Sequence, residues 1–303
     1  MALYPSLCSA NADLPTDMST PENTLELRHA HWTLQLDPAL GGSVRGLWLD
    51  GVPVLRPTPE GLVHAGGSAA YPLVPYSNRI GQGRMVWRGE THALRNGFNA
   101  EPHALHGVGF MRPWSVVAQT PSLAVLRLVH APDAFWPFAF EAEQRFELGA
   151  EGLEVTLSAR NTDPRTQPMG LGWHPFFVRR ADSAVALPVH TQWLAGADVL
   201  PREPQAVPGL NGPVAGLRLD HCFAGDGGAA RLKDGQLDLT LASDGRYWVI
   251  YTPADADFYC VEPVTHLNNA VQQADPLQHG LVSLDTGAEL RLHIRLSGQV
   301  LPR

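Results

Sequence analysis

Apolar and polar residues alternate between residues 138 and 160, and this pattern constrains the fold more than any other part of the sequence. The apolar side chains of the stretch are Phe138, Phe140, Ala142, Phe146, Leu148, Leu153, Val155, Leu157 and Ala159. The sequence Gly149-Ala150-Glu151-Gly152 predicts a turn in the middle. A period of two is the period of a β-strand, so the stretch predicts an antiparallel hairpin with one face in water. The alternating carboxylates of that face are expected to be solvated and not catalytic.

The same alternation recurs along the rest of the chain. Further strands are predicted at residues 25–27, 32–36, 43–49, 52–55, 237–241, 247–251, 258–262 and 290–296. Loops rich in Pro and Gly are predicted between strands, notably at 57–67, 201–216 and 224–228, and residues 70–83 predict a stiff, irregular connection. No stretch shows a long helical period, an internal repeat or a linker. The sequence therefore predicts an all-β fold, one large antiparallel β-sandwich over residues 23–303, with residues 1–22 as a loose lead-in.

Charge and cysteine content limit the function classes. The formal net charge of -8 argues against a nucleic-acid partner and against an anionic membrane surface. No apolar run reaches about 18 residues, so no transmembrane helix is predicted, and the first 22 residues do not resemble a signal peptide. Cys8, Cys222 and Cys260 are odd in number and far apart, so neither a disulfide framework nor a zinc motif is predicted. This cysteine usage predicts a cytoplasmic protein.

Two short stretches each place an ionisable residue before a proline. The first, Gly170–Phe177, has His174 between Trp173 and Pro175 and close to Phe176. The second contains Glu262, which precedes Pro263. The residue before a proline is held away from helical geometry. Histidine exchanges protons near neutral pH, and an aromatic beside such a group suits a sugar, whose C–H face stacks while its hydroxyls form hydrogen bonds. The alternative is that both prolines simply end strands.

Two earlier stretches add further polar candidates. Asn78 and Arg79 follow a proline-rich segment, and the guanidinium of Arg79 is a fork of donors suited to sugar hydroxyls. His106 is followed by Gly107, which allows a ligand or backbone to approach closely. The spacing of His103 and His106 could suggest metal ligands, but no third ligand follows at a convincing spacing, so no metal site is predicted.

Taken together, these residues resemble the aldose 1-epimerase (galactose mutarotase) family over about residues 24–297. The motifs that carry the resemblance occur in the family's order: Asn78-Arg79, His106-Gly107, Asn161 after a strand, His174-Pro175-Phe176, Asp220 and Glu262-Pro263. The resemblance implies a β-sandwich of large curved sheets with its site in an open cleft on a concave face. It also implies interconversion of the α and β anomers of free aldoses without metal or organic cofactor.

The chemistry of ring opening assigns roles to these residues. A hemiacetal opens when one proton leaves the C1 hydroxyl and another reaches the ring oxygen, which requires a general base and a general acid. The family's assignment makes Glu262 the base and His174 the acid, with His106 bound near the ring oxygen. Asn78, Arg79 and Asp220 are expected to hold hydroxyls. Trp173 or Phe176 is expected either beside the sugar ring or in the sandwich core.

Other readings of the same residues remain open. A hexose-6-phosphate 1-epimerase would share the chemistry and would need basic residues for the phosphate, with candidates Arg84, Arg88, Arg95 and Arg112. A non-catalytic sugar-binding module is a second alternative. A glycoside hydrolase could pair Asp220 with Glu262, but two histidines suit proton shuttling better. A serine hydrolase is disfavoured because no Gly-x-Ser-x-Gly motif occurs. The expected partner is a small sugar, and the expected assembly is a monomer or a homodimer.

Overall fold

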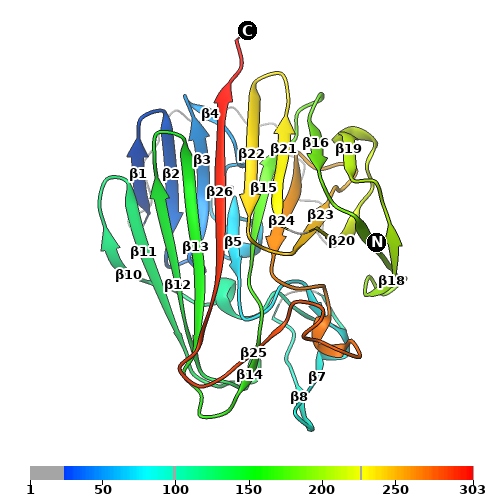
Figure 1. Cartoon of the computed structure of the whole chain (residues 1–303). Helices are drawn as coiled ribbons and strands as arrows, with labels where there is room; N and C mark the ends of the chain where they lie inside the picture. Colours follow the sequence, from blue (N-terminus) through cyan, green and yellow to red (C-terminus); the bar gives the residue numbers. More distant parts are fainter. Residues whose placement is uncertain (1–23, 98–99, 226, 303) are drawn as a thin grey trace.

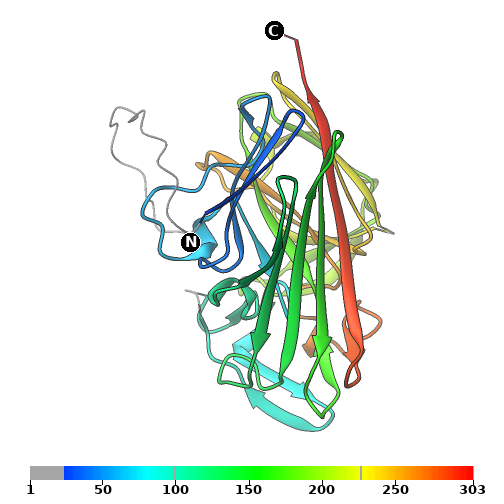
Figure 2. The same ribbon diagram turned by 90° about the vertical axis from the view of Figure 1, so that its left-hand side faces the viewer.

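Two large antiparallel sheets dominate the computed structural model, which describes residues 24–97, 100–225 and 227–302. Figures 1 and 2 show the sheets packed against one another. The predicted lead-in over residues 1–22 lies outside the described residues. No helix in the described part of the chain is long and apolar enough to cross a membrane. The prediction of an all-β fold with large antiparallel sheets is confirmed.

The first sheet has 11 strands and carries most of the candidate residues. In spatial order it contains β1 (Leu25–His29), β2 (Trp32–Asp37), β3 (Ser43–Leu49), β5 (Ala70–Leu73), β15 (Gly172–Val178), β24 (Phe258–Val264), β23 (Tyr247–Tyr251), β20 (Asp220–Ala224), β17 (Thr191–Ala195) and β18 (Pro201–Ala206). The short strand β4 (Val52–Pro53) pairs with β3. Strands from the beginning, middle and end of the chain therefore meet at the centre of this sheet.

The second sheet has nine strands and supplies the other half of the core. Its order is β10 (Ser115–Gln119), β11 (Leu123–His130), β12 (Phe140–Leu148), β13 (Gly152–Asn161), β26 (Glu289–Val300), β22 (Leu237–Ser243), β21 (Gly228–Lys233), β16 (Ala184–Leu187) and β19 (Leu210–Pro213). Large side chains that are almost fully buried include Trp32, Trp173, Phe140 and Phe146. Removal of such a side chain costs about 3–5 kcal/mol of stability.

Short elements complete the chain. Three two-stranded ladders join β6 (Arg79–Ile80) to β9 (Ala104–Leu105), β7 (Arg84–Trp87) to β8 (Glu90–Ala93) and β14 (Gln167–Met169) to β25 (Val282–Leu284). The last two ladders lie at one end of the molecule, at the bottom of Figure 1. The helical turns are 3-10 segments: η1 (Ala65–Gly67), η2 (Gly81–Gly83), η3 (Gly109–Met111), η4 (Val214–Gly216) and η5 (Ala270–Gln272).

The hairpin predicted over residues 138–160 is formed by β12 and β13. Its register runs from Phe140 opposite Asn161 to Leu148 opposite Leu153. The apolar side chains are buried, and Glu143 is exposed. On the same outer face Arg127 pairs with Glu141. The prediction of a solvated charged face is confirmed, and exposed pairs of this kind add at most about 1 kcal/mol each.

The prediction of a loop over residues 201–216 is wrong in part. This segment forms β18 and β19, followed by η4. Both strands lie at sheet edges, where proline is tolerated because one side of the strand needs no N–H donor. The prolines of the segment therefore mark edge strands and not a break in the sheet.

Candidate active site

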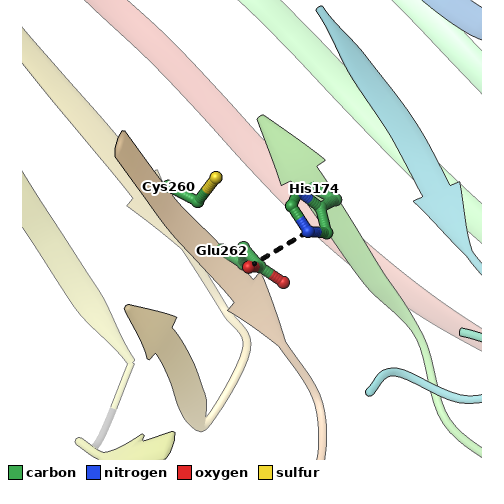
Figure 3. A group of neighbouring side chains, drawn as sticks. All are labelled: His174, Cys260 and Glu262. Atoms are coloured by element: carbon green, nitrogen blue, oxygen red, sulfur yellow. Dashed lines mark ion pairs between the residues drawn. The ribbon is translucent and has the colours of Figure 1, made fainter. Parts of the chain in front are cut away.

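His174 and Glu262 face each other from the adjacent strands β15 and β24. The ladder pairs Gly172 with Val264 and Phe176 with Cys260, so residues 174 and 262 lie opposite one another. The Nε2 atom of His174 is 3.4 Å from Oε1 of Glu262. A dashed line marks this contact in Figure 3. Both side chains are almost fully buried. Two groups that are about 88 residues apart in the sequence are thus brought into contact by strand pairing.

The two prolines that mark these motifs interrupt the ladder beside the pair. Between Gly172 and Phe176 no paired position occurs on the β24 side, and this gap contains Pro175 and faces Pro263. Proline has no N–H to donate, so neither residue can complete the ladder. Alternation along β15 places His174 and Phe176 on one face and Trp173 on the other. Trp173 therefore lies on the face opposite His174 and is 1% exposed, so the structure favours its alternative place in the sandwich core.

Aromatic rings fix the orientation of the His174 imidazole. Tyr71, opposite His174 on β5, stacks on one side with ring centroids 4.6 Å apart. Phe176 also stacks on the imidazole at 4.6 Å, with an interplanar angle of 19°. His106 meets the imidazole edge-on at 5.3 Å. Phe176 itself is 1% exposed, so its position supports the histidine and leaves little of its surface for a sugar.

His106 and Asn78 hold each other through two backbone-directed hydrogen bonds. The His106 N–H donates to the Asn78 carbonyl at 2.8 Å, and the Asn78 N–H donates to Nδ1 of His106 at 3.1 Å. Since Nδ1 accepts, the proton of a neutral His106 lies on Nε2, which is then a donor. Gly107 has a φ of +70°, and a Cβ there would lie 2.3 Å from the Val74 carbonyl oxygen. This close approach explains why glycine follows His106.

Asn78 also positions Arg79. Its Oδ1 accepts hydrogen bonds from the Arg79 backbone N–H at 3.0 Å and from Nη1 at 3.2 Å. The guanidinium of Arg79 is almost fully buried and lies 3.9 Å from Asp220, whose side chain is 26% exposed. Asn78 therefore acts through its neighbours, whereas Arg79 and Asp220 form a charged pair at the partly exposed edge of the site.

Burial and neighbouring charges set the protonation of the central pair. Burial raises the pKa of Glu262 well above its usual range, Asp220 raises it further, and Arg79 opposes the shift. Burial lowers the pKa of His174 to about 3, and the nearby Arg56 guanidinium contributes in the same direction. The pKa of His106 also lies well below its usual range, because of burial and then of His174 and Arg79. Both shifts therefore favour the neutral arrangement of the pair, with its proton on the carboxyl group and a neutral imidazole.

Two polar atoms of the pair have no hydrogen-bond partner among the described residues. They are Oε2 of Glu262 and Nδ1 of His174. Buried polar atoms are usually paired, and exceptions call for an explanation. An acid and a base in contact, with unused polar atoms and with Arg79 and Asp220 nearby, can move protons on a bound polyol.

A model of the aldose 1-epimerase family matches residues 24–297 of the chain. The chain belongs to the aldose 1-epimerase family. An uncharacterized Escherichia coli K12 protein, YphB, is 31% identical over 78% of this chain and 87% of its own length. An E. coli K12 structure described as a proposed aldose 1-epimerase has a TM-score of 0.84 at 26% identity, covering 92% of this chain and 99% of the other.

A more distant structure supports the fold alone. Galactose 1-epimerase from Lactobacillus acidophilus NCFM has a TM-score of 0.74 at 16% identity, covering 91% of this chain and 93% of that one. The family and fold implied by the sequence motifs are confirmed by these similarities. The open cleft, the metal-free site and the individual residue roles remain predictions.

Sequence reasoning missed two residues that border the site. Tyr71 stacks on His174, and Arg56 places its guanidinium 5.1 Å from the ring centroid of Phe176. Nη2 of Arg56 also donates to the Gly67 carbonyl at 2.8 Å. Neither residue carries a local motif: Tyr71 reaches the site through the pairing of β5 with β15, and Arg56 through a hydrogen bond from its backbone N–H to the Phe176 carbonyl at 2.8 Å. The only local sequence feature that could have drawn attention to either residue is Pro72, which follows Tyr71.

Proposed function

We propose that the protein catalyses the interconversion of the α and β anomers of free aldohexoses. The observation that carries the proposal is the 3.4 Å contact between His174 Nε2 and Glu262 Oε1, buried at the centre of the first sheet. Membership of the aldose 1-epimerase family supports the same reaction class. The substrate is a small free sugar, and no cofactor takes part in the proposed chemistry.

In the proposed cycle the pair holds one proton at each stage, on His174 when the ring is closed and on Glu262 when it is open, and both transfers pass through the sugar. In the proposed mechanism Glu262 as carboxylate takes the proton from the C1 hydroxyl, and His174 as imidazolium gives a proton to the ring oxygen. Ring opening therefore leaves a carboxyl group and a neutral imidazole. Rotation about C1–C2 and ring closure from the other face reverse both transfers. No net proton is gained or lost over the cycle.

The pKa shifts of the free protein favour the protonation state of the open-chain stage of this cycle. Burial favours the neutral arrangement of the pair. A bound ring sugar that donates hydroxyl hydrogen bonds to Glu262 stabilises the carboxylate and so favours the ionic arrangement. Sugar binding thus brings the free energies of the neutral and ionic forms of the pair closer together. Protons can then be transferred efficiently in both directions.

The surrounding residues orient the sugar. His106, with its proton on Nε2, donates a hydrogen bond near the ring oxygen. Arg79 donates to hydroxyls and Asp220 accepts from them, since their charged groups lie 3.9 Å apart at the edge of the site. Asn78 and Phe176 position His106, Arg79 and His174 and do not contact the reacting atoms.

Exchange measurements on three sugars test the proposal. Freshly dissolved α-glucose, α-galactose and α-glucose 6-phosphate are followed by polarimetry with and without protein. Acceleration with the free sugars is expected. Acceleration with the phosphorylated sugar alone would favour the hexose-6-phosphate alternative, although Arg112 is already ion-paired with Asp133 and Arg88 donates to Ser283. Binding of sugar without acceleration would indicate the non-catalytic module.

The thiols support the proposal of a cytoplasmic protein. Cys222 and Cys260 are free and buried, which suits a reducing cytoplasm. A monomer or a homodimer remains the expected assembly, and sedimentation of the purified protein would decide between them.

A further inference from the structure

Cys260 lies beside the His174–Glu262 pair and has no part in the proposed proton transfers. It precedes Glu262 by two positions on β24, so both side chains project from the same face of the strand. Figure 3 shows the thiol and the carboxylate directed toward the same region as the imidazole. One ligand atom from each of His174, Cys260 and Glu262 lies within 4.8 Å of the other two. All three side chains are buried.

The spacing of these atoms is close to that of a tetrahedral metal site. Zinc bonds of about 2.0–2.3 Å at tetrahedral angles place neighbouring ligand atoms about 3.3–3.6 Å apart. His174 Nε2 and Glu262 Oε1 are already 3.4 Å apart. Since no two of the three ligand atoms are more than 4.8 Å apart, the thiol sulfur needs a shift of at most about 1 Å to meet this spacing. All three ligands stand on the paired strands β15 and β24.

The donor set selects the kind of ion. A thiolate and an imidazole favour zinc and similar thiophilic ions, whereas magnesium and calcium prefer oxygen ligands. Three protein ligands leave a fourth position open, as in zinc sites that admit water or substrate. Oε2 of Glu262 has no partner among the described residues and is a further acceptor at the same place. Asp220 adds negative charge nearby, and Arg79 and Arg56 oppose it.

We infer that zinc binds to His174 Nε2, Cys260 Sγ and the Glu262 carboxylate, and that this ion blocks sugar turnover. Binding forms three bonds to the metal and releases the thiol proton and the proton shared by the acid–base pair. The occupied pair has neither a base nor a proton to deliver. The blocking effect rests on the proposed epimerase activity, but binding of the metal does not.

Cobalt provides a direct test of the ligands. The full chain is treated with a chelator, dialysed and titrated with Co²⁺ to equilibrium, and the near-ultraviolet absorption that accompanies a cobalt–thiolate bond is recorded. One equivalent is expected to bind with this absorption, and Zn²⁺ is expected to displace it. Cys260→Ser is expected to lose the absorption and to raise the dissociation constant of Zn²⁺ at least about tenfold, since even indirect supports of metal ligands contribute 10–100-fold.

Two cysteine variants serve as matched controls. Cys222 is a free, buried cysteine on the same sheet, and Cys8 is the third cysteine of the chain. Cys222→Ser and Cys8→Ser are expected to bind Co²⁺ as the wild type does. Absence of a thiolate absorption in the wild type, or its survival in Cys260→Ser, would overturn the inference. Circular dichroism verifies the fold, and Cys260→Ala replaces Cys260→Ser if serine unfolds the protein.

The activity arm separates this inference from the proposed function. Zn²⁺ is expected to inhibit anomer exchange by the wild type and to spare Cys260→Ser, which keeps its basal rate. Zinc that accelerates the chelated wild type would contradict the blocking role. If the protein exchanges no anomers, the proposed function fails while the cobalt titration still decides whether the metal site exists.

Discussion

Substitution of either member of the buried pair is expected to give stability curves with opposite dependence on pH. In Glu262→Gln the remaining His174 stays neutral in the folded protein, because its pKa is lowered from 6.5 to about 3. Below pH 6.5 the unfolded chain therefore binds one more proton, and the free energy of unfolding rises as the pH rises toward 6.5. In His174→Asn the remaining Glu262 holds its proton to a higher pH in the folded protein than in the unfolded chain, because burial raises its pKa well above 4.5. Above pH 4.5 the folded chain then binds one more proton, so the free energy of unfolding falls as the pH rises.

The magnitude follows from proton linkage. One full proton of difference changes the free energy of unfolding by about 1.36 kcal/mol per pH unit. Between pH 5 and 6 each unfolded side chain is mostly ionised, so the change is about 1 kcal/mol for Glu262→Gln and up to about 1 kcal/mol for His174→Asn, and the two curves diverge by up to about 2 kcal/mol. In the wild type the two effects cancel. The double variant Glu262→Gln/His174→Asn lacks both ionisable groups. Its curve therefore gives the pH dependence that all other residues cause, and this curve is subtracted from those of the single variants.

Urea unfolding followed by tryptophan fluorescence measures these values at pH 5.0, 5.5 and 6.0. The Glu262→Gln curve is expected to rise against the double variant and the His174→Asn curve to fall. Curves of both variants that run parallel to the double variant would refute the reasoning, because they would mean that neither group has a shifted pKa in the folded protein.

Three further predictions follow from the same geometry. The rate profile of anomer exchange against pH is expected to have its acid limb at about pH 3, where the buried His174 titrates, and its alkaline limb well above pH 4.5, set by Glu262. An acid limb near pH 4.5, the value of an ordinary glutamate, would contradict this. Arg79→Ala and Asp220→Ala are each expected to raise KM and lower kcat through misplacement of the sugar, and unchanged kinetics on all aldoses would remove that residue from the site. Trp173→Phe is expected to lower the free energy of unfolding by about 1–3 kcal/mol and to leave KM unchanged, and a large rise in KM without loss of stability would place the indole in the sugar site.

The sequence predicted the elements that depend on local pattern. The hairpin of β12 and β13 alternates in its own sequence and has a glycine-rich turn, so its register needs no distant information. The motifs containing His174 and Glu262 were found in the same way, since each proline restricts its own neighbour. The edge strand β18 was missed, because prolines that mark an edge and prolines that mark a loop look alike in a sequence.

The contacts that depend on strand order could not be predicted. Residues 70–83 were expected to be irregular, yet their first four residues form β5 at the centre of the first sheet, with Tyr71 against His174. The degree of burial of His174 and Glu262 also required the fold, and with it the direction of their pKa shifts. The same register places Cys260 beside the pair, which spacing along the chain could not show.

The central claim is that Glu262 and His174 move the protons that exchange anomers. The most direct test is exchange NMR on an equilibrated aldohexose with wild type and Glu262→Gln, with circular dichroism confirming that both are folded. The variant keeps the shape of the side chain but lacks a base, so exchange is expected to fall at least about a hundredfold, or about 2.7 kcal/mol in the barrier. A folded Glu262→Gln protein that exchanges anomers at the wild-type rate would contradict the mechanism and move the base to another carboxylate, with Asp220 the first to test.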